Sequence, residues 1–159
     1  MGSACGTDLA RARGSDGEST LQNMIRIKRT YEPRARGDGR RILVERLWPR
    51  GMKKESLQAQ AWLKAVAPST SLRKWFGHRP ERWPEFRRRY RNELRANEDA
   101  WSPILEASKR GTVTLLYSAH DVEHNGAVVL REYLTEHRRV AHAKVKRAKA
   151  PSSRNHGNH

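Results

Sequence analysis

The sequence lacks several features that would place it in a particular class of protein. Its 159 residues contain a single cysteine, Cys5, which rules out an internal disulfide and a multi-cysteine zinc site. No run of about 18 apolar residues occurs, so we expect no transmembrane helix. The N-terminus also lacks the apolar stretch that is typical of a signal peptide. We therefore expect a cytoplasmic protein that does not insert into a membrane.

Acidic residues are also scarce relative to basic ones. The chain has 33 Lys and Arg residues against 17 Asp and Glu, a formal net charge of +16. Counted by segment, residues 24–137 carry a net charge of +10 and residues 138–159 carry +7, whereas residues 1–23 carry −1. The positive charge favours acidic partners, namely nucleic acid, phosphorylated small molecules or an anionic surface. The alternative is solvated surface charge with no partner.

The composition divides the chain into three segments. Residues 1–23 are rich in Gly, Ser and Ala and show no hydrophobic period, which predicts a disordered extension. Residues 24–137 contain all five tryptophans and every clearly patterned stretch, so we expect a single domain with one core there. Residues 138–159 contain no acidic residue, which predicts a basic, largely disordered tail, with a helical start as the alternative for its first part and disorder after Pro151.

The hydrophobic pattern of residues 24–137 indicates strands and helices. Strands are predicted over residues 24–31, 41–48 and 112–118. Helices are predicted from Ser56 to about Val66, from Ser69 or Ser71 to Gly77, over 82–97, from Ser102 to Gly111, and over 126–137. Helices separate the second strand from the third, which favours a parallel crossover. The predicted fold class is α/β, a small, helix-rich single domain around a three-stranded, mostly parallel sheet.

Four stretches of the patterned region carry a family resemblance. In order along the chain they are RILVERLWPRGMKK, APSTSLRKWFGH, FRRRYRNEL and TLLYSAHDVEHNGAVVLREYL. Together they resemble the YeaO-like proteins, an uncharacterised bacterial group assigned to a domain of unknown function. The resemblance spans about residues 24–137. It implies an α/β fold and a cytoplasmic bacterial protein, and it implies no established reaction.

The stretch ERLWPRG, residues 45–51, follows the second predicted strand. Parallel strands place their C-terminal ends along a shared crevice, so we expect Arg46, Trp48 and Arg50 to lie near the loop of residues 118–125. Arg50, next to a glycine, would present a planar guanidinium beside accessible backbone, which suits a phosphate or a carboxylate. In the alternative, Arg46 pairs with a carboxylate inside the protein and Trp48 belongs to the core.

The loop SAHDVEHN, residues 118–125, offers Ser118, His120 and Asn125 as ligand-binding residues. A helix that begins near Asn125 would add its free amides and its dipole to an anion site. The alternative is a solvated loop in which Asn125 only caps the helix. A hydrolytic triad of Ser118, His120 and Asp121 is disfavoured, because residues so close in sequence rarely reach triad geometry. We also expect no metal and no cofactor, because the two histidines lie in a loop.

Two functions from different classes remain, beside a purely structural role. The first is binding of an anionic small molecule, a phosphate or a carboxylate, in the crevice at the strand ends, with or without catalysis. The second is non-specific nucleic-acid binding by the arginine-rich helix over 82–97 and the basic tail. The arginines that would contact the phosphate backbone in this second function are Arg87, Arg88, Arg91 and Arg95.

Overall fold

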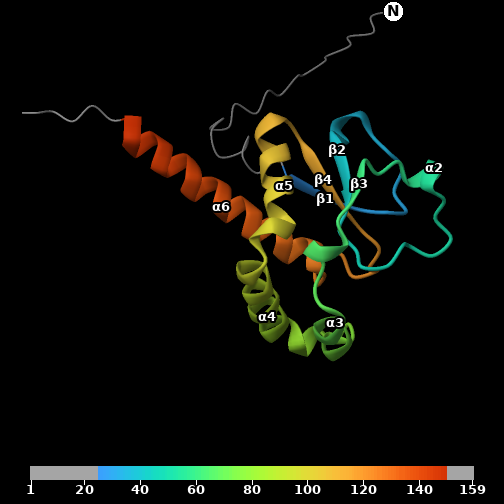
Figure 1. The fold of residues 1–159 in the computed structure, drawn as a ribbon. Helices are drawn as coiled ribbons and strands as arrows, with labels where there is room; N and C mark the ends of the chain where they lie inside the picture. Colours follow the sequence, from blue (N-terminus) through green and yellow to red (C-terminus); the bar gives the residue numbers. More distant parts are fainter. Residues whose placement is uncertain (1–24, 150–159) are drawn as a thin grey trace, which may run out of the picture.

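The computed structural model of the chain describes residues 25–149, and its elements are labelled in Figure 1. The predicted disordered extension, residues 1–23, lies outside the described residues. The strands are β1 (Ile25–Arg29), β2 (Arg40–Leu43), β3 (Ala61–Trp62) and β4 (Val113–Tyr117). The α-helices are α2 (Lys54–Leu57), α3 (Thr70–Phe76), α4 (Trp83–Ala96), α5 (Glu98–Arg110) and α6 (Gly126–Lys149). The short 3₁₀ helices are η1 (Arg36–Asp38), η2 (Lys64–Val66) and η3 (Pro80–Arg82).

The strands form one parallel sheet in the order β1-β4-β2-β3. β4 lies between β1 and β2, so that Val113 pairs with Ile25 on one side and with Arg40 on the other. The predicted α/β fold class and the parallel crossover are confirmed. The sheet has four strands rather than the predicted three, because β3 was not expected.

Residues 56–66, predicted to form one helix, instead form the end of α2, then β3 and η2. α2 stops after one turn because Gln58 adopts a left-handed conformation, with φ 51°, which cannot continue a right-handed helix. The Gln60 amide then donates to the Arg41 carbonyl (2.8 Å), and the Leu63 amide also bonds to β2 (2.9 Å). Pairing with β2 therefore overrides the local helical pattern.

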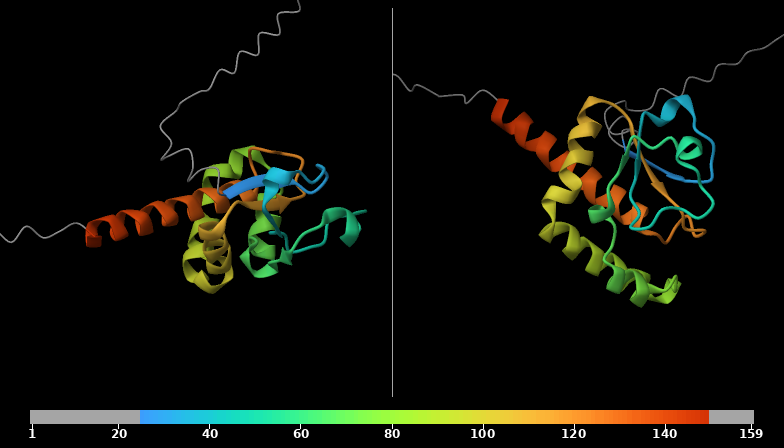
Figure 2. Two further views of the ribbon diagram at one scale, coloured as in Figure 1. Left: turned by 90° about the horizontal axis from the view of Figure 1, so that it is seen from above. Right: turned by 45° about the vertical axis from the view of Figure 1, so that its right-hand side comes forward.

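Helices α3 to α6 lie on one side of the sheet, whereas α2 lies on the other (Figures 1 and 2). The helical side holds the main core, to which the strands contribute Ile25, Ile42, Val113, Leu115 and Tyr117, together with Val44 directly after β2. The opposite face presents Leu43 and Leu116, which pack against Leu57 of α2 and against Trp48 and Met52 of the preceding loop. The second face is thus covered mainly by the chain that follows β2.

A buried ionic network ties the strands to η1 at the start of β2. Arg41 is 1% exposed, and its Nη1 lies 2.5 Å from Asp38 Oδ2. Arg41 also donates from Nη2 to the Leu57 carbonyl (2.9 Å), and Lys28 of β1 lies 3.2 Å from Asp38 Oδ1. The Thr114 hydroxyl of β4 donates to the Asp38 carbonyl (2.6 Å). The network therefore joins β1, β2 and β4 through one aspartate.

The boundaries of α3 and α5 depend on capping and on a proline. Ser69 caps α3, with its Oγ accepting a hydrogen bond from the Leu72 amide (3.2 Å), and Gly77 ends the helix at φ 54°. α5 begins at Glu98 rather than at the predicted Ser102, so that Pro103 lies inside the helix. A proline there removes one backbone hydrogen bond, which packing of the helix against the core compensates.

The last helix, α6, continues to Lys149, past the predicted end of the domain at residue 137. Residues 138–149, the first part of the predicted basic tail, form helix, which is the helical start that the sequence leaves open. Figures 1 and 2 show this end of α6 projecting away from the other elements. Residues 150–159 lie outside the described part of the chain. Among the described residues, no helix is both long and apolar enough to cross a membrane.

Candidate functional site

A crevice of about 610 Å³ opens at the C-terminal ends of β2 and β4. Its volume falls within the range of roughly 300 to 1,000 Å³ that is typical of small-molecule sites. Three parts of the chain line it, namely the segment after β2, the end of α3 with the turn that follows, and the loop after β4. The lining residues are Glu45, Arg73, Lys74, His78, Ser118, Ala119, His120 and Asp121.

The crevice lies where the chain leaves two neighbouring strands in opposite directions. After β2, the chain covers the face of the sheet that carries Leu43 and Leu116. After β4, the chain enters α6, which packs on the opposite face through Val129 and Leu130. Because the two connections diverge, they leave the strand ends between them uncovered. Parallel α/β sheets typically bind ligands at such positions.

Glu45 is a half-buried carboxyl in the wall of the crevice, two residues after β2. Its Oε1 accepts a hydrogen bond from the Ser118 amide (3.0 Å), which joins the ends of β2 and β4. Burial raises the pKa of this carboxyl above its usual value, although the Ser118 hydrogen bond and the positive charges of Arg73 and His78 act in the opposite direction. A carboxyl with reduced acidity is therefore held beside two basic side chains.

α3 supplies two of the basic side chains in the crevice wall, those of Arg73 and Lys74. Within residues 25–149, neither side chain forms a hydrogen bond or an ion pair with another protein group, so both are free to bind a ligand. The start of α3 is fixed by Glu93 of α4, which accepts hydrogen bonds from the Ser69 amide (2.9 Å) and from the Ser69 hydroxyl (2.5 Å). The two cations are therefore carried by a helix with a defined position.

His78 reaches the crevice through an unusual backbone conformation. Its φ is 57°, directly after Gly77 at φ 54°. A left-handed conformation costs a residue with a Cβ about 1–2 kcal/mol, and such strain is concentrated at functional sites. Two consecutive left-handed residues turn the chain at the end of α3, and this turn places His78 in the crevice wall.

The loop after β4 forms another wall of the crevice, and β1 supports it. Arg29 Nε donates to the Ala119 carbonyl (3.0 Å), and Arg29 Nη2 lies 3.5 Å from His120 Nδ1. Ser118 is held by its amide, which donates to Glu45 as described above. Residues from the ends of β1, β2 and β4 therefore converge at this loop.

Asp121 is engaged within its own loop. Its Oδ1 accepts hydrogen bonds from the Glu123 amide (2.9 Å) and the His124 amide (3.0 Å), and its Oδ2 lies 2.9 Å from His124 Nδ1. The hydrogen bond from the Glu123 amide, followed by those from His124, lowers the pKa of Asp121 below its usual value. Asp121 therefore shapes the loop, and its negative charge is already partly compensated.

Of the six residues predicted for the ligand site, Ser118 and His120 line the crevice, and the other four lie elsewhere. Arg46 Nε donates to the Pro68 carbonyl (2.8 Å), so this side chain holds the segment before α3. Glu45 lines the crevice, whereas Arg46, the next residue, lies in a bend of the chain and contributes to a different part of the surface, beside Val66 and Ala67.

Trp48 and Arg50 lie on the connection that covers the second face of the sheet. The Trp48 Nε1 donates to the Met52 carbonyl (2.6 Å), and its ring packs edge-on against Trp62 at a centroid distance of 5.2 Å. Arg50 is exposed, and its carbonyl accepts a hydrogen bond from the Tyr31 hydroxyl (3.3 Å). Neither side chain lines the crevice, because the connection turns away from the strand ends.

Asn125 caps α6 and is 6% exposed. Its Oδ1 accepts a hydrogen bond from the Val128 amide (3.1 Å), and its Nδ2 donates to the Asp121 carbonyl (2.9 Å). These bonds use the side chain within the protein. The structure therefore places Asn125 at the helix cap, and the crevice lining does not include it.

The four arginines predicted to contact nucleic acid lie on α4, and most of them pair with nearby groups. Arg87 forms an ion pair with Glu132 of α6 (2.6 Å), and Arg91 forms one with Glu136 of the same helix. Arg88 pairs with Glu85 (2.5 Å), and Arg95 donates to the Asn92 side chain (3.1 Å). The first two pairs fasten α4 to α6, so these arginines contribute to packing.

Sequence reasoning does not assign Glu45, Arg73, Lys74 or His78 to the anion crevice, although it counts Arg73, Lys74 and His78 with the basic surface of the nucleic-acid alternative. Arg73, Lys74 and His78 belong to the stretch LRKWFGH, whose apolar residues indicate a short core helix. The glycine before His78 was predicted to end that helix, and this was the available signal that the chain turns there. No sequence pattern indicated that this turn would lie beside the end of β2.

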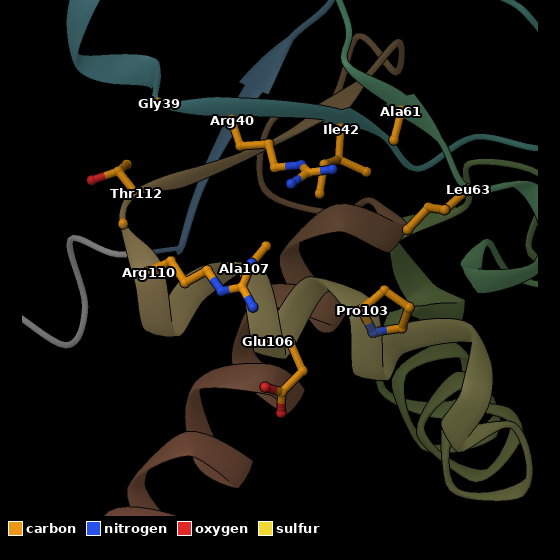
Figure 3. A pocket seen from close by; sticks show the side chains of 11 residues that line it. Gly39, Arg40, Ile42, Ala61, Leu63, Pro103, Glu106, Ala107, Arg110 and Thr112 are labelled. Carbon is orange, nitrogen blue, oxygen red and sulfur yellow. The ribbon is translucent and has the colours of Figure 1, made fainter.

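A second cavity, of about 590 Å³, lies between α5 and the strands β2 and β3 (Figure 3). Its floor is largely apolar, and Figure 3 shows Ile42, Ala61 and Leu63 across from Ala107. Arg40, Glu106 and Arg110 are the charged residues that line it, at the C-terminal end of α5. Among residues 25–149, no group of three His, Cys, Asp or Glu residues is placed to hold a metal ion.

The fold and the crevice define a small parallel α/β protein with a ligand-sized opening at its strand ends. The family described as the inactive DUF488-N3 subclade matches residues 24–155, and the chain belongs to this family. It is similar to the uncharacterized protein YeaO of Escherichia coli, with 43% identity over 110 residues, which cover 69% of this chain and 96% of YeaO. The predicted membership of the YeaO-like group is confirmed.

Further relatives are also uncharacterized. A protein of Mycobacterium tuberculosis is 37% identical over 113 residues, which cover 71% of this chain and 95% of the relative. A protein of Mycobacterium bovis matches with the same identity and coverage. No solved structure matches the chain. The family match, residues 24–155, spans the sheet, α3 and the loop after β4, which are the elements that form the crevice.

Proposed function

We propose that the chain binds a small anionic ligand, carrying a phosphate or a carboxylate, in the crevice at the ends of β2 and β4. The observation that carries this proposal is the presence of Arg73 and Lys74 in the crevice wall, without an ion pair or side-chain hydrogen bond in residues 25–149. Unpaired guanidinium and ammonium groups in a concave site attract an anion and bind it through charge-assisted hydrogen bonds. His78 and His120 add further donors to the same crevice.

The proposed role is binding rather than turnover. The description of the family as an inactive subclade supports this choice. The chemistry of the lining supports it as well, since within the described residues the Ser118 hydroxyl has no hydrogen bond to a histidine that could act as its base. Glu45 and Asp121 both accept backbone hydrogen bonds, which suits a structural or ligand-positioning role for each of them.

The proposal is tested by thermal unfolding of the full chain with inorganic phosphate, citrate and a panel of sugar phosphates at fixed ionic strength. A ligand at about 100 times its Kd stabilises the folded state by roughly 2.7 kcal/mol, which shifts the midpoint measurably. We expect a selective shift in the wild type and its loss in Arg73→Gln and Lys74→Gln. Arg50→Gln is the matched control, because Arg50 is exposed outside the crevice and should leave the shift intact.

The variants decide between two placements of the site. A shift that survives in Arg73→Gln and Lys74→Gln but disappears in Arg50→Gln would overturn the crevice and favour the position first predicted from the sequence. The absence of any shift in the wild type would contradict ligand binding of this class. Both arginine variants remove one positive charge, so a difference between them does not arise from net charge.

Non-specific nucleic-acid binding is a second candidate, and the end of α6 supports it better than α4 does. Residues 138–149 carry six Lys or Arg residues and no acidic residue. Their described side chains are exposed from Arg139 onward, on a helix end that projects from the rest of the chain. The α4 arginines are mostly paired with glutamates, and paired charges attract phosphates less strongly.

This second candidate is tested by replacing four cations of α6, Arg139, Lys144, Lys146 and Arg147, with glutamine in the full chain. The salt dependence of binding to duplex DNA should weaken by about 0.9 in log–log slope for each phosphate contact that is lost. The matched control replaces Arg36, Arg50, Lys53 and Lys54, which are also exposed, and should leave the slope nearly unchanged. An equal change in both variants would indicate a net-charge effect without a binding surface.

A further inference from the structure

We infer that the ligand of the crevice is a phosphorylated polyol, whose hydroxyl groups donate hydrogen bonds to Glu45 while its phosphate binds Arg73 and Lys74. This inference rests on the proposed function and names the class of ligand. Its starting observation is the carboxyl of Glu45, which is half-buried in the crevice wall close to basic side chains. Binding of an anion does not by itself explain why a negatively charged side chain, that of Glu45, lies in the same site.

Glu45 has one oxygen in use and one oxygen free. Oε1 accepts the Ser118 amide. Oε2 is not among the buried polar atoms without a partner in residues 25–149, so it is open to the crevice and can accept a hydrogen bond there. The Ser118 bond also fixes the orientation of the carboxyl, because it ties the side chain to the end of β4. A ligand hydroxyl in the crevice can replace the water that hydrates this oxygen.

The charges around Glu45 indicate which donor fits. Arg73 and His78 lie close enough for their positive charges to lower the pKa of Glu45, and Lys74 lines the same crevice. An ammonium group on the ligand would approach these cations and would be repelled by them. A hydroxyl group donates a hydrogen bond without adding positive charge. Neutral hydroxyl donors therefore fit this carboxyl better than an amine does.

The two requirements define one ligand with two different ends. The phosphate end needs cations, which α3 supplies, and the hydroxyl end needs an acceptor at the end of β2, which Glu45 supplies. In parallel α/β proteins that bind nucleotides, an acidic residue likewise accepts hydrogen bonds from sugar hydroxyls. The crevice volume of about 610 Å³ accommodates a phosphate together with a short polyol.

The experiment compares matched ligands by calorimetric titration of the full chain. Glycerol 3-phosphate and propyl phosphate carry the same phosphate and the same number of carbons, and only the first has hydroxyl groups. A hydrogen bond to a charged acceptor predicts that glycerol 3-phosphate binds at least about tenfold more tightly. Phosphoethanolamine, which replaces the hydroxyls with an ammonium group, should bind no better than propyl phosphate.

Glu45→Gln provides the protein variant for the same comparison. The ratio between glycerol 3-phosphate and propyl phosphate should fall toward one, while Arg73→Gln should weaken both ligands together. Equal affinity of the wild type for both ligands would overturn this inference and leave anion binding standing. Binding of neither ligand, nor of inorganic phosphate, would contradict the proposed function itself. If Glu45→Gln does not fold, the ligand comparison on the wild type still decides.

Discussion

His78 combines a strained backbone with a side chain that lines the candidate site. Its left-handed conformation, with φ 57°, is one that glycine adopts without a steric penalty. The chain nevertheless carries an imidazole there, directly after a glycine in the same conformation. The side chain lines the crevice. A histidine at this position therefore lowers the stability of the fold and adds a hydrogen-bond donor to the candidate site.

Replacing His78 with glycine should therefore separate stability from binding. We expect His78→Gly to raise the free energy of unfolding by up to about 1 kcal/mol, because the left-handed strain is removed. The same variant should bind phosphate ligands more weakly, because the imidazole is lost. Chemical denaturation and calorimetric titration measure the two effects. Gly77→Ala is the control, since it introduces strain at φ 54° and should destabilise the protein without altering the crevice lining.

At the same scale, the sequence indicates the segment after β2 as a candidate part of the site but not the direction of each side chain. Its chemistry favours Arg46, Trp48 and Arg50. In the structure Glu45 of this segment lines the crevice, whereas Arg46 bonds to the Pro68 carbonyl. These directions depend on the course of the chain after β2, which a single sequence does not give.

At the scale of secondary-structure elements, the sequence predicts the ends of a helix where the residues at those ends determine them. The side chain of Ser69 caps α3, and Gly77, which has no side chain, ends it, as the sequence predicts. β3 was not predicted, because its two residues are held by pairing with β2, and such pairing depends on residues far away in sequence. The projecting half of α6 has a basic composition that occurs both in helices and in disordered tails, so the sequence indicates a helical start of the tail but not its length.

The cap of α6 gives a prediction that distinguishes a structural residue from a ligand-binding one. Asn125→Ala removes the acceptor of the Val128 amide and should lower the free energy of unfolding by about 1 kcal/mol, while phosphate affinity stays the same. Asn125→Asp keeps an acceptor at the helix N-terminus and should lose less stability. Thermal unfolding and titration test both variants. Loss of binding without loss of stability would instead make Asn125 part of the ligand site.

At the scale of the whole molecule, the buried network around Asp38 couples the strands of the sheet. Burial alone would raise the pKa of Asp38, but hydrogen bonds from the Ala35 amide, from Lys28 and from Arg41 outweigh it, so the pKa lies below the usual value of 3.8. A carboxyl with a lowered pKa stabilises the folded state fully above its unfolded pKa. This contribution is lost as the pH falls through the lower pKa of the folded state.

Removing this charge should therefore destabilise the entire fold. Asp38→Asn leaves the buried Arg41 guanidinium without its counter-ion and should lower the free energy of unfolding by about 3 kcal/mol or more at pH 7. The difference from the wild type should shrink as the pH falls below about 4, since protonation also neutralises Asp38. Denaturant unfolding at several pH values measures both effects. The double variant Asp38→Asn with Arg41→Met should recover part of the loss, and an equal or greater loss would contradict a charge-based cause.

Because α6 is long, a small tilt of this helix displaces its projecting end by several ångströms. Twelve residues, 138–149, extend past the predicted end of the domain, and at 1.5 Å per residue they span about 18 Å. The other end of the same helix is capped by Asn125, which also bonds to Asp121 in the crevice wall. A tilt of 10° about the packed half would displace the far end by about 3 Å. A spin label near Lys144 would therefore magnify any rotation of α6 against the rest of the protein.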